Sequence, residues 1–98
     1  MFTKRLGELV TDDDYKRLQL ALVLRPEAGP IIRGSGGLRK VRWAASGSGK
    51  SGGYRFIYYW DKSKDRIYMI FVYAKRAQSD LTPDQLKILR KLVKENLE

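Results

Sequence analysis

Three stretches rich in β-branched and aromatic residues follow one another along the chain and constrain its fold more than any other feature. They span residues 38–44, 54–60 and 67–74, and stretches of this composition are typical of β-strands. The last two are separated only by the polar and charged residues 61–66, a length that suits a hairpin. Because consecutive strands with short connections pair in antiparallel fashion, we expect a small antiparallel sheet of three to four strands.

A helical pattern follows this predicted sheet and carries clear start signals. Thr82 and Gln85 are spaced as a capping box, and Pro83 stands at the first helical position. Apolar residues then recur at helical spacing and indicate a face that packs on the sheet. These residues are Leu86, Leu89, Val93 and Leu97.

Helical patterns also precede the predicted sheet. The aspartates at 12–14 follow Thr11, an N-cap candidate, where the helix dipole favours negative charge, and Pro26 ends this helix. A shorter helix is expected over residues 2–10. The predicted fold class is therefore α+β, a single domain over residues 1–98 with N-terminal helices and a C-terminal helix packed on the sheet.

The chain contains no cysteine and no histidine. Thiolate nucleophiles, serine–histidine triads and histidine-ligated zinc are therefore impossible within it. Lys4 and Arg5 lie where the apolar region of a signal peptide would begin, and no stretch approaches the roughly 18 apolar residues of a membrane span. We expect a cytoplasmic protein without a membrane anchor.

The charge of the chain indicates a polyanionic partner. Lys and Arg number 20 against 11 Asp and Glu, a net charge of +9. No acidic residue lies between Ala28 and Trp60, which predicts a phosphate-binding face in this stretch. Its cations are Arg33, Arg39, Lys40, Arg42, Lys50 and Arg55, and we expect Arg33, Arg39 and Lys50 to contact nucleic acid.

Five cations are placed so that strand pairing in sequence order brings them together. Lys40 and Arg42 project from one face of the first strand because alternate residues share a face. Arg55 begins the second strand, and Lys75 and Arg76 follow the third. RNA carries its own nucleophile, the 2′-hydroxyl, so such a cluster is suited to cleave it. We expect the three arginines to hold the phosphate and Lys40 or Lys75 to take the acid–base role.

Two other kinds of site are disfavoured. Gly49-Lys50-Ser51 is similar to the end of a phosphate-binding P-loop, but Ala44 replaces its first glycine and a strand rather than a helix follows. A metal nuclease needs several converging carboxylates, whereas the acids here fall in predicted helix caps and turns. We therefore expect neither a metal ion nor a cofactor.

The order of these motifs resembles the RelE/HigB family of toxins from bacterial toxin–antitoxin pairs. The resemblance lies in Ile32–Arg42, Gly49–Tyr59, Tyr73–Lys75 and Asp80–Thr82. It implies a RelE-like, microbial-ribonuclease-like fold and an endoribonuclease (mRNA interferase) that cuts messenger RNA in the ribosomal A site. It also implies a cognate antitoxin with a helix-turn-helix domain, similar to HigA. The family's basic active-site residues correspond to Lys40, Arg42, Arg55, and Lys75 or Arg76.

The chain departs from the family pattern at two places. Some members stack the substrate base on a tyrosine beyond the last strand, where this chain has Leu81 and Thr82, so this role is either unfilled or moved, with Tyr73 as the candidate. Relatives also begin with a strand ahead of the first helix, whereas only Met1 precedes Phe2. We therefore expect either a sheet edge that lacks this strand and is open to a partner chain, or a true start that lies further upstream.

Two alternative functions belong to other classes. One is a ParE-like toxin, which binds DNA gyrase and is not an enzyme, and the other is a basic module that only holds nucleic-acid phosphates. The cationic set at Lys40, Arg42, Arg55 and Lys75 favours the nuclease, because a gyrase-binding protein has no chemical reason to assemble it.

Overall fold

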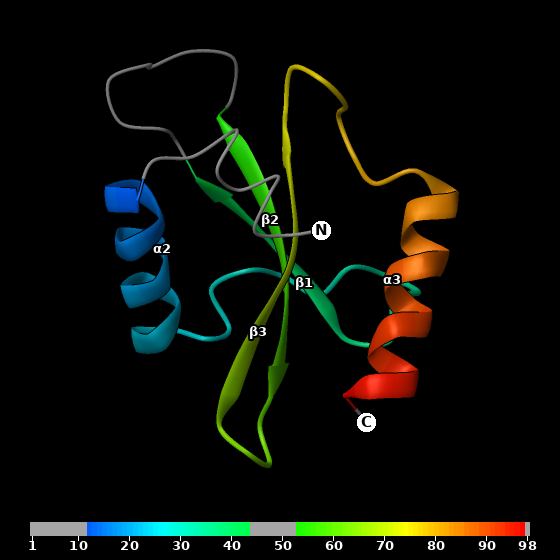
Figure 1. Cartoon of the computed structure of the whole chain (residues 1–98), viewed down its shortest axis with the longest axis horizontal. Helices are drawn as coiled ribbons and strands as arrows, with labels where there is room; N and C mark the ends of the chain where they lie inside the picture. Colours follow the sequence, from blue (N-terminus) through cyan, green and yellow to red (C-terminus); the bar gives the residue numbers. More distant parts are fainter. Residues whose placement is uncertain (1–11, 44–52, 98) are drawn as a thin grey trace.

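In the part of the chain that the structure describes, a three-stranded sheet lies between two helices. The computed structural model describes residues 12–43 and 53–97, in the order α2 (Asp12–Leu24), β1 (Leu38–Trp43), β2 (Tyr54–Asp61), β3 (Arg66–Ala74) and α3 (Pro83–Asn96). The strands pair antiparallel in the order β1-β2-β3, and α2 and α3 cover opposite faces of the sheet (Figure 1). The predicted α+β class is confirmed, while the helix expected over 2–10, the N-cap at Thr11 and the loop at Lys50 lie outside the described residues.

The hairpin predicted between the last two strands is present. Asp61 Oδ1 accepts hydrogen bonds from the hydroxyl of Ser63 at 2.7 Å and from its backbone N–H at 3.1 Å. Asp65 adopts a positive φ of 51°, a conformation that aspartate tolerates better than most residues. Together these features turn the chain by local hydrogen bonding and set the register in which Asp61 faces Arg66.

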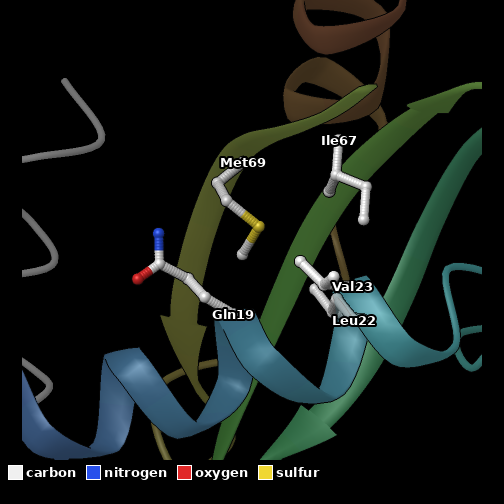
Figure 2. A pocket seen from close by; sticks show the side chains of 5 residues that line it. All are labelled: Gln19, Leu22, Val23, Ile67 and Met69. Carbon is white, nitrogen blue, oxygen red and sulfur yellow. The ribbon is translucent and has the colours of Figure 1, made fainter. Parts of the chain in front are cut away.

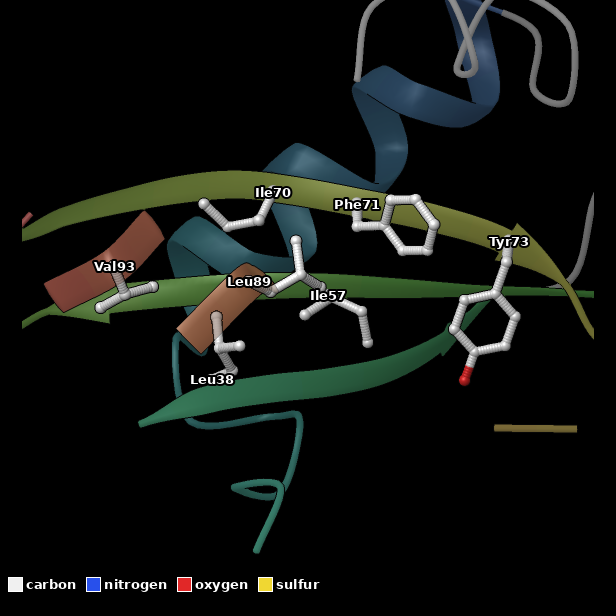
Figure 3. Close-up of a cluster of buried hydrophobic side chains, with 7 residues drawn as sticks. All are labelled: Leu38, Ile57, Ile70, Phe71, Tyr73, Leu89 and Val93. Carbon is white, nitrogen blue, oxygen red and sulfur yellow. The ribbon is translucent and has the colours of Figure 1, made fainter. Parts of the chain in front are cut away.

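Helix α3 begins and packs as its sequence predicts. The Thr82 side chain accepts from the N–H of Gln85, the Gln85 side chain accepts from the N–H of Thr82, and Pro83 opens the helix. Leu89 and Val93 are buried against the sheet (Figure 3). Their buried neighbours in this cluster are Leu38, Ile57, Ile70, Phe71 and Tyr73.

Helix α2 packs against the face of the sheet opposite to α3. Leu18 and Leu22 pack against the sheet residues Phe56, Tyr58 and Val72. A small pocket of about 110 Å³ lies between α2 and β3, lined by Gln19, Leu22, Val23, Ile67 and Met69 (Figure 2). Neither helix described here has the length and apolar character needed to span a membrane.

The segment between α2 and β1 is held against the sheet by one tyrosine. The Tyr58 hydroxyl donates to the carbonyl of Pro26 at 2.6 Å and accepts from the N–H of Gly29 at 2.9 Å. Gly29 approaches β1 so closely that a Cβ atom there would lie 2.7 Å from the carbonyl oxygen of Lys40. The Lys40 N–H in turn donates to the carbonyl of Pro30 at 3.2 Å. The backbone of Lys40 therefore lies between the Gly29–Pro30 segment and its β2 partner Ile57.

Candidate active site

The antiparallel register sets three of the predicted residues in one row across the sheet. Arg42 of β1 lies opposite Arg55 of β2, and Arg55 lies opposite Tyr73 of β3. Strand alternation places Lys40 and Arg42 on the same face as Leu38, which packs in the α3 cluster. The structure thus brings Lys40, Arg42 and Arg55 to one face of the sheet, as expected from spacing.

An acidic residue for which the sequence predicted no role in the site joins this group. Lys40 Nζ donates to Asp80 Oδ1 at 3.1 Å, and the same oxygen accepts from the N–H of Leu81 at 2.9 Å. The Leu81 N–H, then the hydrogen bond and charge of Lys40, and finally the charge of Lys75 hold the pKa of Asp80 below its ordinary value, although partial burial opposes them. Asp80 is therefore an anion with two cations near it.

Tyr73 is enclosed at the same place. Its side chain is fully buried, and no hydrogen-bond partner for its hydroxyl is found among the described residues. Burial raises the pKa of Tyr73, the charge of Asp80 adds to this rise, and the charge of Arg55 opposes it. The phenol is thus protonated at neutral pH and lies in the fields of an anion and a cation.

The burial of Tyr73 bears on its predicted stacking role. Its ring centroid lies 6.2 Å from that of Phe71 within the hydrophobic cluster (Figure 3). A ring packed in this way presents no face to a nucleobase. Base stacking by Tyr73 stays a prediction that requires the ring to become accessible.

The two arginines of the row differ in exposure. Arg42 is exposed, whereas Arg55 is only 4% exposed and donates to the carbonyl of Tyr54 at 3.3 Å. A guanidinium remains charged at every physiological pH, and its field is stronger where water is excluded. Arg42 is therefore placed to touch a phosphate, and Arg55 supplies a fixed positive charge beneath it.

Three more predicted residues lie around this group. Arg33 lines an open hollow of about 420 Å³ whose wall also includes Lys40 and Asp80. Lys75 is half-buried at the end of β3, where its N–H donates to the carbonyl of Gly53 at 3.1 Å. Arg76 is exposed in the same turn. These cations extend the positive surface beyond the row formed by Arg42, Arg55 and Tyr73.

Arg39 lies elsewhere. It alternates with Lys40 and so faces the α2 side, where it donates to the carbonyl of Gly29 at 2.8 Å. Its guanidinium carbon is 5.7 Å from the centroid of the Trp60 ring. These contacts give Arg39 a role in holding the segment before β1. Lys50, predicted as a further contact, lies outside the described residues.

The group can supply the elements of phosphodiester cleavage. Arginine side chains match phosphate oxygens and offset developing negative charge, and the Lys40 ammonium is able to donate a proton. Of the residues described, no three acidic side chains come together in a way that would hold a metal ion. The lysine and arginine side chains are therefore the candidate catalytic groups on this face.

Residues 23–98 match a protein-family model whose description is "RelE toxin of RelE / RelB toxin-antitoxin system". The matched range covers 76 of the 98 residues, since it runs from 23 to 98 inclusive. It contains β1, β2, β3 and α3, together with every residue of the group around Lys40 and Asp80.

Proposed function

This chain belongs to the RelE toxin family of toxin–antitoxin systems, and we propose that it is an endoribonuclease that cleaves messenger RNA with its own lysine and arginine side chains. Membership of the family makes an antitoxin its partner. We propose further that this antitoxin carries a helix-turn-helix domain, as in the HigA type, and that the toxin acts in the cytoplasm.

The observation that carries the proposal is the gathering of Lys40, Arg42 and Arg55 on one face of the sheet. In RNA cleavage a base takes the proton of the 2′-hydroxyl, the 2′-oxygen attacks the adjacent phosphorus, and the bond to the 5′-oxygen breaks; an acid protonates that oxygen, so that a 2′,3′-cyclic phosphate and a 5′-hydroxyl remain. Arg42 would bind the phosphate oxygens, and the buried charge of Arg55 would stabilise the added negative charge of the transition state.

The acid–base role falls to Lys40 or Lys75, which both lie near Asp80. The Lys40 Nζ donates a hydrogen bond to Asp80 in this structure, and a lysine ammonium is the form that protonates a leaving 5′-oxygen. Arg76 is the remaining predicted phosphate contact.

We propose that the substrate is message held in the ribosomal A site. A net charge of +9 favours association with the polyanionic ribosome through counterion release and long-range attraction. Arg33, at the hollow beside Lys40, and Lys50 are the further contacts proposed to RNA. Arg39 would contribute less because its guanidinium already binds Gly29 and Trp60.

Induced expression followed by primer extension on cellular messages tests this function. Wild-type protein should produce cuts within translated codons, and Lys40→Met should abolish most of them. Lys64→Met removes the same charge from the exposed β2–β3 turn and should cut like the wild type. Intact message accompanied by supercoiling defects would instead identify a gyrase-binding toxin.

A further inference from the structure

We propose that Asp80 is a positioning residue that holds the Lys40 ammonium beside the Arg42–Arg55 pair for RNA cleavage. The inference rests on the proposed nuclease function and assigns an acidic residue to its otherwise basic site. An anion at the edge of an RNA-binding face requires an explanation, because it repels the phosphates that the neighbouring cations attract.

The contact with Lys40 is direct and well defined at both ends. The Lys40 side chain is 30% exposed and reaches from β1 to Asp80, which lies two residues before the N-cap of α3, at 3.1 Å. The backbone of Lys40 is held by Pro30, and the carboxylate is held by the N–H of Leu81. Since lysine has a long and flexible side chain, such an anchored acceptor fixes its ammonium in one place.

A purely structural role makes a different prediction. An acidic residue near the start of α3 stabilises that helix whether or not it contacts Lys40. The hydrogen bond from the Leu81 N–H to Asp80 also orders the turn before α3. Asparagine at position 80 retains an oxygen that accepts from Leu81 while it loses the charge. Asp80→Asn therefore separates the effect on the turn from the effect on Lys40.

Asp84 provides a matched control. It is an exposed acid in the first turn of α3, so Asp84→Asn changes the net charge as much as Asp80→Asn does and at the same end of the helix. Of these two acids, Asp80 is the one that contacts Lys40. A difference between the two variants therefore reports that contact rather than the charge of the helix terminus.

Single-turnover cleavage of message on programmed ribosomes, measured over a range of toxin concentrations, separates the maximal rate from the half-saturating concentration. We expect Asp80→Asn to lower the maximal rate by about 10- to 100-fold, in line with the cost of a misplaced catalytic group. The half-saturating concentration should fall about twofold or more, because a repulsive charge has left the RNA-binding face. Asp84→Asn should keep the maximal rate of the wild type.

The double variant tests whether Asp80 acts through Lys40. In a Lys40→Met background, Asp80→Asn should cause no further loss of maximal rate, since the group that it positions is absent. An equal loss in both backgrounds, or equal maximal rates for Asp80→Asn and Asp84→Asn, would overturn the positioning role and leave the nuclease function standing. A wild-type protein that cleaves no message would overturn the nuclease function itself, and the inference with it.

Discussion

Arg42 and Arg55 lie directly opposite each other on β1 and β2, so two permanent positive charges face each other across an antiparallel pair. Like charges at such positions destabilise a sheet, and burial of Arg55 to 4% exposure weakens the screening by water. A bound anion would reduce this repulsion.

We expect Arg42→Gln to make the protein more stable and less able to bind RNA. Removing one of two facing like charges should raise the free energy of unfolding by about 0.5 kcal/mol, and more at low salt than at high salt. Loss of a phosphate contact should reduce the slope of log affinity against log salt by about one. Chemical denaturation and RNA-binding titrations at several salt concentrations measure the two effects.

Arg66→Gln is the matched control for this substitution. Arg66 is an exposed strand residue like Arg42 but lies opposite Asp61. Its position opposite an acid involves no like-charge repulsion, so removal of the Arg66 charge should leave the free energy of unfolding unchanged or lower it by up to about 0.5 kcal/mol. If both substitutions shift stability in the same direction, the facing charges do not explain the effect.

Removal of two buried tyrosine hydroxyls should affect the stability of the protein differently. Tyr58→Phe leaves the Gly29 N–H and the Pro26 carbonyl without their buried partner and should cost about 1 to 3 kcal/mol of unfolding free energy. Tyr73→Phe deletes a buried hydroxyl for which the described residues offer no partner, and stability should stay within about 0.5 kcal/mol or increase. Thermal unfolding of both variants decides this, and equal losses would contradict it.

Local sequence signals predicted the secondary structure closely. Thr82, Pro83 and Gln85 placed the start of α3 because a capping box is a property of neighbouring residues. The β-strand stretches lie within one residue of β1, β2 and β3 at each end. The spacing of Lys40 and Arg42 likewise placed both on one face, because alternation is intrinsic to a strand.

The parts that were missed depend on tertiary packing. Asp80 is 40 residues from Lys40 in the sequence, and the two meet only because α3 docks on that face of the sheet. The burial of Arg55 and Tyr73 also follows from packing rather than from local pattern. For Arg39 a signal was available: it alternates with Lys40, so the same rule that grouped Lys40 with Arg42 placed Arg39 on the other face.

Gly29→Ala should both destabilise the protein and disturb the active-site face. Its Cβ would lie 2.7 Å from the Lys40 carbonyl oxygen and 3.0 Å from the Tyr58 ring, so the segment before β1 must move away from the sheet. Overpacking of this kind costs about 1 to 3 kcal/mol. We expect a lower unfolding midpoint and slower cleavage at temperatures where the variant is still folded, and an unchanged midpoint would contradict the close approach.

The interactions of the Asp80 carboxylate should make the free energy of unfolding depend on pH in the acid range. Asp80→Asn should remove this contribution. The pKa of Asp80 is held below the ordinary 3.8 in the folded protein, so around that pH the unfolded chain binds more protons at this site. The stabilisation is therefore present above about pH 4 and is lost as pH falls through the folded pKa. Because the side chain is 65% exposed, the contribution should remain below about 1 kcal/mol.

Denaturation of the wild type, Asp80→Asn and Lys40→Met between pH 7 and pH 3 measures this contribution. The difference between the wild type and Asp80→Asn should narrow as the pH falls through the acid range, since a protonated Asp80 no longer pairs with Lys40 as an anion. Lys40→Met should show a smaller acid-dependent loss than the wild type but not none, because the Leu81 N–H and the charge of Lys75 still favour the carboxylate. A difference between the wild type and Asp80→Asn that stays constant across this range would show that Asp80 contributes through packing or hydrogen bonding rather than through its charge.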